Sequence, residues 1–282
     1  ASRSRRRGSV MISYTESQVQ RLRELGEDVY SDARFESESE REKSFSKEMA
    51  KLKASNDKQI DGMFERPERS ALARLESDLA DLLVGKGFIE VKTPSIMSVA
   101  SLEKMTVTRD SPLFRQVFFV DEKRCLRPML APNLYFVMRK LRDRTDGPVR
   151  IFEIGSCYRK ESRSTYHLEE FTMLNFVELG AKNPDEGLRK CISDVMGAAG
   201  LDYEIVSEES DVYGTTVDVE TDGQEIASGA VGPHPLDAAH DIHEPWFGAG
   251  FGLERIIMAK SGRTNIKKAG RTLVYLNGAK ID

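Results

Sequence analysis

Two segments of the sequence place an arginine where it could bind a phosphate. Arg159 follows the mostly apolar run 152–158, and Glu161 lies two residues further on in a polar loop. A guanidinium at the end of a rigid strand can bind a phosphate through two parallel hydrogen bonds and stabilise charge that develops at phosphorus. Glu161 could accept a hydrogen bond from an adenine amino group, and Phe171, beyond the loop, could stack on a base. The alternative is a surface hairpin with an exposed Arg–Glu ion pair, which contributes little.

The second segment is rich in glycine and ends in Arg255. Gly248, Gly250 and Gly252 alternate with other residues just before a helix is expected to begin. A strand without side chains lets a ligand approach its backbone, and Arg255 in the first helical turn would lie over the same sheet. The GxGxG spacing lacks the βαβ unit of a dinucleotide fold, and no GxxxxGK[ST] loop occurs, which excludes those two nucleotide sites. Alone, this segment could also be a glycine-rich turn beside an exposed arginine.

A third segment, 233–245, contains side chains that could bind a metal. They are His234, Asp237, His240, Asp241 and His243. The prolines of the segment indicate a loop, in which the three-residue spacing of His240 and His243 does not place them on one helix face. We therefore favour a structural role over a metal site.

The remaining pattern predicts the elements that hold these segments. Pro67 begins an amphipathic helix with leucines at three- and four-residue spacing, which Gly85 or Gly87 ends, and a strand over 88–92 follows and stops at Pro94. Further strands are predicted at 116–121, 149–156, 171–179, 211–219 and 225–231, with helices at 132–142, at 185–199 and from about residue 252. Strands that follow one another through turns favour an α+β fold, with an antiparallel β-sheet flanked by helices.

Residues 1–66 form a charged preface with little core material. Thr15 and Gln18 have the spacing of a capping box for a short helix, and 37–53 reads as a solvated helix with alternating charges. Met11 is a candidate natural start, in which case residues 1–10 are an added remnant. We therefore divide the chain into a helical preface at 1–66 and a main domain at 67–282.

Composition excludes several classes of protein. The net charge of −4 means that any nucleic-acid binding must come from local basic patches. The cysteines Cys125, Cys157 and Cys191 are far apart and form no CxxC pair, which argues against structural zinc or a disulfide framework and fits a reducing cytoplasm. No apolar run approaches the length of a membrane span, so we expect no membrane partner.

The helix–strand unit ending at Pro94, the Arg159 segment and the Arg255 segment resemble, in this order, the three signature motifs of class II aminoacyl-tRNA synthetases. Three further stretches, 125–135, 171–176 and 227–233, resemble the pyrrolysyl-tRNA synthetases and not their phenylalanyl or phosphoseryl relatives. The resemblance covers residue 67 to the C-terminus. The preface resembles the short N-terminus of members that lack a separate tRNA-binding domain. The resemblance implies the class II catalytic fold.

It also implies an ATP site. Arg159 would bind the α-phosphate and Arg255 the γ-phosphate and one face of the adenine, and both would stabilise the transition state. The adenine would be framed by Glu161, the backbone of His167 and Leu168, and Phe171, with Gly250 beneath the nucleotide. Glu225 and Ser228 match positions that bind Mg²⁺, a hard cation that prefers oxygen ligands. Catalysis would then rest on positioning and electrostatics, without a covalent nucleophile.

By the same resemblance, the amino-acid pocket would take pyrrolysine or another acylated lysine. Its walls would be Ala131, Leu134, Tyr135, Met138, Val177, Ala230 and Trp246. Asn175 would hydrogen-bond the side-chain amide, and Tyr213 would close over the ligand. Apolar walls discriminate by only about 1–3 kcal/mol per methylene, so the polar anchor sets identity. An unacylated lysine would leave its ammonium against an apolar wall, which is costly.

The implied partners are tRNA(Pyl) and a second copy of the chain, since class II enzymes of this type are usually homodimers with the unit ending at Pro94 at the interface. Candidate phosphate contacts are Arg21, Arg23, Arg139, Lys140, Arg142 and Arg144. Two alternatives stay open. One is a non-catalytic synthetase paralogue, against which the presence of Arg159, Glu161, Glu225 and Arg255 argues. The other is a class II ligase that acts without tRNA.

Overall fold

The structure is a computed structural model that describes residues 11–26, 30–160, 166–210 and 214–281. The helices are α1 (Glu16–Leu25), α2 (Glu38–Glu65), α3 (Ala71–Gly85), α4 (Val99–Lys104), α5 (Pro112–Arg115), α6 (Ala131–Arg142), α7 (Pro184–Ala199) and α8 (Leu253–Ser261), with short 3-10 turns η1 (Tyr30–Asp32), η2 (Pro235–His240) and η3 (Ile266–Lys268). The strands are β1 (Ile89–Glu90), β2 (Ile96–Ser98), β3 (Arg124–Leu126), β4 (Val149–Tyr158), β5 (Glu170–Leu179), β6 (Glu204–Ser210), β7 (Gly214–Thr221), β8 (Gln224–Gly232), β9 (Trp246–Gly252), β10 (Tyr275–Leu276) and β11 (Ala279–Lys280).

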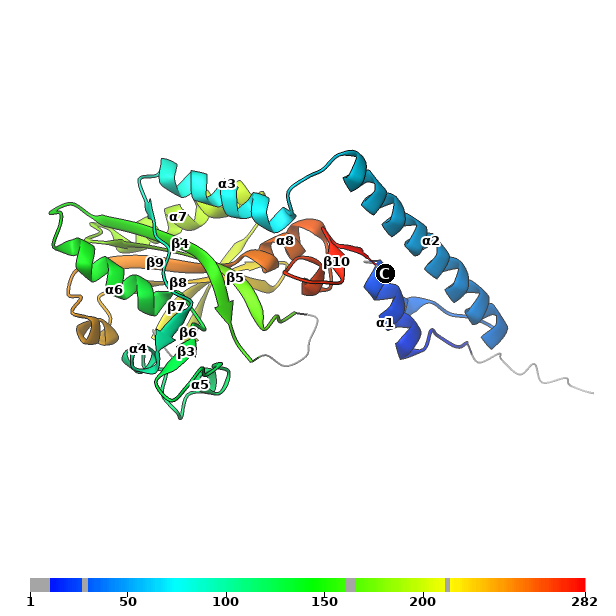
Figure 1. Cartoon of the computed structure of the whole chain (residues 1–282), viewed down its shortest axis with the longest axis horizontal. Coiled ribbons are helices and arrows are strands. Elements are labelled where there is room, and N and C mark those ends of the chain that lie inside the picture. Colours follow the sequence, from blue (N-terminus) through cyan, green and yellow to red (C-terminus); the bar gives the residue numbers. More distant parts are fainter. Residues whose placement is uncertain (1–10, 27–29, 161–165, 211–213, 282) are drawn as a thin grey trace, which may run out of the picture.

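A seven-stranded sheet organises the described part of the chain, in the order β1-β4-β5-β9-β8-β7-β6. All neighbours are antiparallel except β1, which runs parallel to β4. Figure 1 shows the long central strands β4, β5 and β9 side by side, with helices around them. The predicted α+β fold with an antiparallel sheet flanked by helices is therefore confirmed, with one parallel pair at its β1 edge.

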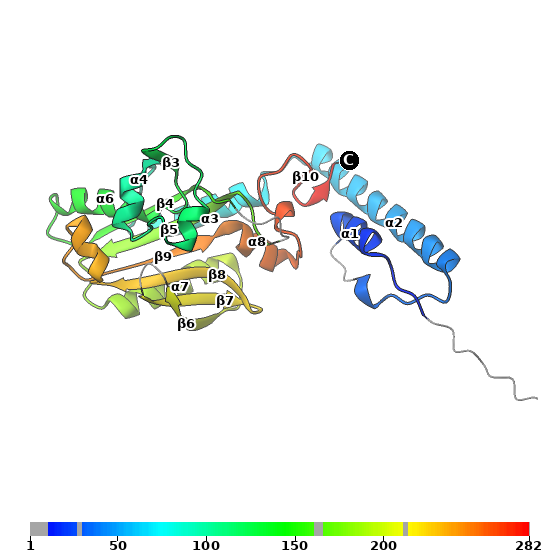
Figure 2. The ribbon, with the colours of Figure 1, turned by 90° about the horizontal axis from the view of Figure 1, so that it is seen from below.

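The two faces of the sheet belong to two different hydrophobic cores. Alternate residues of a strand point to opposite faces. On β5, Leu174 and Phe176 pack with α3, α7 and α8, whereas Val177 and Leu179 pack with α6, α4 and η2. Figure 2 shows α6 and α4 on one side of the strands and α7 on the other. The second face, under α6, is the one that forms the cavity described below.

Several predicted elements need correction. Residues 116–121 do not form a strand. The helix α5 starts at Pro112, and backbone hydrogen bonds continue its last turn as far as Val117. The segment therefore makes only an isolated β-bridge, between Phe119 and Cys125. The helix predicted over 37–53 continues to Glu65 as α2, and the helix predicted from Pro67 begins at Ala71, where the Ser70 side chain caps it. The strand at 88–92 is only two residues long in β1. Strand β6 was not predicted.

The N-terminal helices pack against the C-terminal end of the chain. α1 begins with the predicted capping box between Thr15 and Gln18. Asn56 of α2 donates to the main-chain oxygen of Leu25 and accepts from the backbone N–H of Lys280. Figure 1 shows α2 extending away from the sheet, with the C-terminus beside α1. Within the described ranges, no helix is both long and apolar enough to cross a membrane.

Candidate active site

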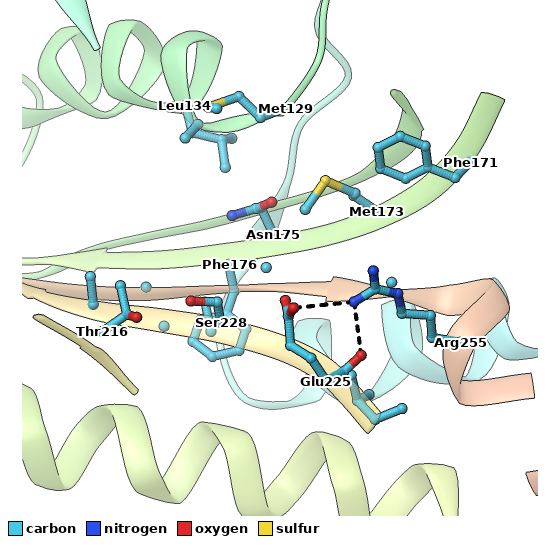
Figure 3. A pocket seen from close by; sticks show the side chains of 18 of the residues that line it. Met129, Leu134, Phe171, Met173, Asn175, Phe176, Thr216, Glu225, Ser228 and Arg255 are labelled. Carbon is cyan, nitrogen blue, oxygen red and sulfur yellow. Dashed lines mark hydrogen bonds and ion pairs between the residues drawn. The ribbon is translucent and has the colours of Figure 1, made fainter. Parts of the chain in front are cut away.

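A cavity of about 390 Å³ opens on the α6 face of the sheet, over β5, β8 and β9 (Figure 3). Every described residue that was predicted for the ATP and amino-acid sites lines it: Ala131, Leu134, Tyr135, Met138, Arg159, His167, Leu168, Phe171, Asn175, Val177, Glu225, Ser228, Ala230, Trp246, Gly250 and Arg255. Glu161 and Tyr213, also predicted, lie outside the described residues. The structure therefore brings residues spread over more than a hundred positions of the chain to one cavity.

Arg159 lies at the end of β4 at one side of the cavity. Its Nε donates to the main-chain oxygen of Pro128 at 2.9 Å, and its guanidinium carbon lies 5.3 Å from the centre of the Phe171 ring. A cation over an aromatic face is held by the ring quadrupole. The strand end, a carbonyl and a ring thus direct the Arg159 guanidinium over the cavity.

Arg255 and Glu225 meet on the opposite side of the cavity. The Nη1 of Arg255, in the first turn of α8, donates to the main-chain oxygen of Glu225 at 2.9 Å and lies 3.4 Å from its carboxylate. Figure 3 shows this contact, with Ser228 further along β8 on the same side of the cavity. A carboxylate and a hydroxyl on one strand are oxygen donors of the kind that Mg²⁺ binds together with phosphate and water, so these residues fit that ion.

Glu254, next to Arg255, is a pocket residue that the sequence analysis missed. Its side chain is buried and accepts from the backbone N–H of Thr172 at 2.9 Å and from the Thr172 hydroxyl at 2.9 Å. Burial raises the pKa of Glu254, while the hydrogen bonds from Thr172 and the nearby Arg271 oppose that rise. Because these bonds tie the start of α8 to β5, Glu254 fixes the direction in which Arg255 leaves the helix.

The glycines of β9 form the floor of the cavity. Gly248, Gly250 and Gly252 line the cavity, whereas Phe247 and Phe251, at the alternate positions of β9, belong to the opposite core. A Cβ at residue 250 would lie 2.9 Å from the Oδ1 of Asn175, which is closer than a Cβ approaches a neighbouring heavy atom in folded proteins. Glycine is therefore required there for the Asn175 side chain to keep its place on the neighbouring strand.

The other end of the cavity is mainly apolar. Ala131, Leu134, Tyr135 and Met138 come from α6, and Val177, Ala230 and Trp246 come from three strands. Asn175 lies between the two ends and points into the cavity in Figure 3. Its Oδ1 is buried and has no hydrogen-bond partner among the described residues. An unsatisfied buried acceptor is costly and indicates a place where a ligand donates a hydrogen bond.

Further lining residues were missed, although a pattern for some of them was present. They are Leu113, Met129, Tyr166, Met173, Phe176, Thr216, Ile226, Gly229, Ala249, Glu254 and Ile266. Met173 shares its strand face with Phe171, Asn175 and Val177, so two-residue alternation would have found it. Met129 and Thr216 come from other elements, and nothing in their local sequence marks them.

The predicted basic cluster at the end of α6 is partly engaged within the chain. Arg139 pairs with Asp241 at 3.1 Å, and Arg142 pairs with Glu244 at 3.5 Å. Lys140 and Arg144 are exposed, as are Arg21 and Arg23 on α1. In the segment 233–245, Asp237 instead accepts hydrogen bonds from Tyr135 and Trp246. The described residues contain no group of three or more potential metal ligands.

The chain is similar to known proteins of one enzyme class. Residues 57–275 match the family model of the tRNA synthetases class II core domain (F). A lysine–tRNA ligase of Actinobacillus succinogenes is 30% identical over 139 residues, which are 46% of this chain and 25% of that ligase. A threonine–tRNA ligase of Nitrosomonas eutropha is 28% identical over 99 residues, 33% of this chain and 15% of that ligase. The chain thus matches a quarter or less of the length of these relatives.

Two solved structures are similar over nearly their whole length. A crystal structure of the pyrrolysyl-tRNA synthetase from Desulfitobacterium hafniense is 43% identical, with a TM-score of 0.90, and the match covers 96% of this chain and 98% of that one. A second structure, of a pyrrolysyl-tRNA synthetase protein of the same organism, is 42% identical, with a TM-score of 0.91 and 99% of both chains covered. The chain therefore belongs to the class II aminoacyl-tRNA synthetases and, within them, to the pyrrolysyl-tRNA synthetase family.

Proposed function

We propose that this chain activates pyrrolysine, or another lysine acylated on its Nε, with ATP and transfers it to the cognate tRNA(Pyl). The observation that carries the proposal is the buried, unpartnered Oδ1 of Asn175 beside an apolar wall. The N–H of a side-chain amide would satisfy that oxygen, while the apolar wall receives the acyl group and disfavours the ammonium of lysine. Solved relatives of the same family support this substrate class.

The reaction needs two phosphate-binding groups, one on each side of the nucleotide. In the first step a carboxylate oxygen of the amino acid bonds to the α-phosphorus of ATP, and the bond from that phosphorus to pyrophosphate breaks. Arg159 stabilises the charge that develops at the α-phosphate, and Arg255 holds the far end of the triphosphate. Phe171 and the backbone at His167 and Leu168 frame the adenine. In the second step the terminal ribose hydroxyl of the tRNA takes the aminoacyl group, and AMP leaves.

Glu225 and Ser228 would hold a Mg²⁺ ion between β8 and the phosphates. The ion would neutralise phosphate charge, which is the chemistry that it supplies in phosphoryl and nucleotidyl transfer. Glu225 also pairs with Arg255 at 3.4 Å, so the same carboxylate holds this arginine near the cavity.

Pyrophosphate exchange into ATP tests the activity. The purified protein with Mg²⁺ should exchange pyrophosphate in the presence of pyrrolysine or a simple Nε-acyl-lysine and not with the twenty common amino acids. Asn175→Ala should raise the KM for the acyl-lysine by about tenfold or more while the KM for ATP stays within about twofold. Exchange with phenylalanine or another common amino acid would contradict the substrate class. No exchange at all would favour the non-catalytic paralogue, and exchange without any tRNA charging would favour the tRNA-independent ligase.

Binding of tRNA is assigned to exposed basic groups on two surfaces. Arg21 and Arg23 lie on α1, and Lys140 and Arg144 lie at the end of α6. Because Arg139 and Arg142 already pair with acidic side chains, reversing the charge of Lys140 and Arg144 is the cleaner test. Lys140→Glu together with Arg144→Glu should lower tRNA charging and leave pyrophosphate exchange intact. Unchanged charging would remove the α6 surface from the proposal.

We also propose a homodimer in the cytoplasm. Val84 at the end of α3 and Ile89 in the edge strand β1 are exposed apolar residues of the unit that ends at Pro94. Exposed apolar side chains suit a subunit interface. Light scattering at micromolar concentration should give twice the mass of the chain, and a single-chain mass would refute the dimer. The cytoplasmic location stays a prediction from the cysteines, which fractionation of the source cells would test.

A further inference from the structure

Asp237 lies behind the apolar end of the cavity and is 1% exposed. Its Oδ1 accepts a hydrogen bond from the hydroxyl of Tyr135 at 2.6 Å. Its Oδ2 accepts from the indole N–H of Trp246 at 2.6 Å and from the backbone N–H of His234 at 2.6 Å. One buried carboxylate in η2 is therefore shared by a helix residue, a strand residue and its own turn.

The three donors are neutral, and no described Lys or Arg forms an ion pair with Asp237. Burying a carboxylate without a cation is costly, and the three hydrogen bonds offset part of that cost. Tyr135 and Trp246 line the cavity and Asp237 does not. The carboxylate thus draws the polar ends of both aromatic residues to the outside of the pocket wall.

The two rings are also fixed relative to each other. Tyr135 and Trp246 pack edge to face, with 5.8 Å between ring centres, and His240 stacks on Tyr135 at 4.3 Å. Without Asp237, the hydroxyl of Tyr135 and the N–H of Trp246 would need other acceptors, and a cavity or its ligand could supply them. The position of the carboxylate therefore decides whether this wall presents hydrocarbon or hydrogen-bond donors.

We propose that Asp237 is a positioning residue that sets the acyl-chain specificity of the amino-acid pocket by holding the Tyr135 and Trp246 donors away from it. This inference rests on the proposed function, since it assigns the apolar end of the cavity to the acyl group. Because the Tyr135 hydroxyl and the Trp246 N–H point away from the cavity, Asn175 makes the hydrogen bond to the ligand amide. The wall beyond Asn175 then favours a hydrocarbon acyl group. The chemical class favoured is an Nε-acyl-lysine whose acyl group carries no exposed acceptor facing that wall.

Asparagine at residue 237 would separate positioning from simple packing. The amide oxygen of Asp237→Asn can still accept from Trp246 and His234, which only donate. The amide nitrogen then replaces Oδ1 and donates to the Tyr135 oxygen, so the hydroxyl proton of Tyr135 must turn elsewhere. The substitution keeps the size of the side chain and changes the direction of one hydrogen bond.

The experiment compares wild type, Asp237→Asn, Tyr135→Phe and the double variant by pyrophosphate exchange. Two substrates are used: an Nε-acyl-lysine with a hydrocarbon acyl chain, and one of equal length with an ether oxygen near the chain end. Asp237→Asn should raise the KM for the hydrocarbon substrate by about tenfold and shift selectivity towards the ether by about threefold or more, with the KM for ATP unchanged. The selectivity shift should vanish in the double variant, because no hydroxyl remains to turn inward.

Equal selectivity in wild type and folded Asp237→Asn would overturn the inference, as would a KM rise that is the same for ATP and for both lysine substrates. If Asp237→Asn does not fold, Tyr135→Phe carries the test: because the hydroxyl is held away from the ligand, the ratio of the KM values for the ether and hydrocarbon substrates should match that of wild type, and a shift of that ratio by about threefold or more would overturn the inference.

Fluorescence separates this inference from the proposed function. Trp246 is the only tryptophan of the chain, so its emission reports its environment directly. Asp237→Ala should shift that emission, because the indole N–H loses its acceptor, while Asp237→Asn should leave it near wild type. Absence of exchange in the wild type would contradict the proposed function. An identical emission spectrum for wild type and Asp237→Ala would instead contradict the bond between Asp237 and Trp246.

Discussion

Arg255 contacts both the backbone and the side chain of Glu225 on one side of the cavity. The guanidinium lies 2.9 Å from the main-chain oxygen of Glu225 and 3.4 Å from its carboxylate. The first turn of α8 is thereby tied to the start of β8. An arginine can keep such a bond through one nitrogen and present its other nitrogens to a phosphate in a fixed planar arrangement, whereas a lysine must make both contacts from a single nitrogen.

Replacing Arg255 by lysine should therefore impair ATP use although the charge is kept. We expect kcat/KM for ATP to fall by about 10²-fold in pyrophosphate exchange. Lys260→Met, in the last turn of the same helix, is the control and should change little. An Arg255→Lys enzyme with normal kcat/KM for ATP would show that the planar guanidinium is not needed.

Glu225→Gln should change the requirement for Mg²⁺. The amide keeps one oxygen donor and loses the negative charge that a hard cation prefers. We expect the Mg²⁺ concentration at half-maximal exchange to rise by about tenfold, as measured by titration at saturating ATP. Glu220→Gln on the neighbouring strand β7 is the control. The same titration curve for both variants would contradict a magnesium role for Glu225.

Phe171 should serve ATP and not the amino acid. Its ring lies 5.3 Å from the Arg159 guanidinium carbon at the phosphate side of the cavity. Phe171→Leu keeps an apolar side chain but removes stacking on the base, so the KM for ATP should rise by about fivefold. Phe136, which is 62% exposed on α6, provides the matched surface aromatic. A larger effect of Phe171→Leu on the amino-acid KM than on the ATP KM would reverse the assignment of this end of the cavity.

A buried ion pair supports the frame around the site. Arg127 lies 2.7 Å from Glu153, with the two side chains only 4% and 1% exposed. Arg127→Met leaves the Glu153 charge buried without its cation, and we expect a loss of about 3–5 kcal/mol in urea unfolding. Arg150 forms an equally short pair with Glu178, but its side chain is 40% exposed. Arg150→Met should cost about 0–1 kcal/mol. Similar losses for both variants would show that burial does not decide the strength of these pairs.

His240 should make stability depend on pH below neutrality. Burial lowers the pKa of His240 below its usual value of 6.5, and the backbone of Lys104 and the charge of Asp237 partly oppose this shift. As pH falls from 6.5 towards the folded-state pKa, the unfolded chain binds a proton that the folded chain does not, so stability is lost. His240→Phe, which can still stack on Tyr135, should lose less stability between pH 7.5 and 5.5 in urea unfolding. Parallel losses in the two proteins would exclude a contribution from His240.

Local patterns were enough to predict most of the long elements and the residues around the cavity. Strands β4 and β5 are long, mostly apolar runs, and the apolar residues of α3 and α7 have helical spacing, so the local sequence predicts each of these elements. The strand prediction at 116–121 was wrong because the apolar and aromatic residues of this segment suit a strand, while Pro112 starts a helical turn that runs into it. The prediction ended α2 too early, at residue 53, because the helix has a pattern of charges and no continuous apolar stripe that would mark where it ends.

Long-range contacts were beyond the reach of the sequence. Asp237 looked like one of several loop residues with metal-binding side chains, and only the fold shows that Tyr135 and Trp246 both donate to it. Arg139 and Arg142 looked like a basic cluster because their partners, Asp241 and Glu244, are a hundred residues away along the chain. Such pairings depend on tertiary packing, which no spacing rule encodes.

The contact between Lys268 and Gly26 bears on how the chain could be shortened. The Lys268 side chain is 3% exposed, and its ammonium donates to the main-chain oxygen of Gly26 at 2.9 Å. Removal of residues 1–66 would leave the buried Lys268 ammonium without this acceptor and would expose the apolar surface around it. The predicted division at residue 66 is therefore a boundary in composition and not in packing. A trimmed catalytic unit would need a substitute at residue 268, such as methionine, before it could be expected to stand alone.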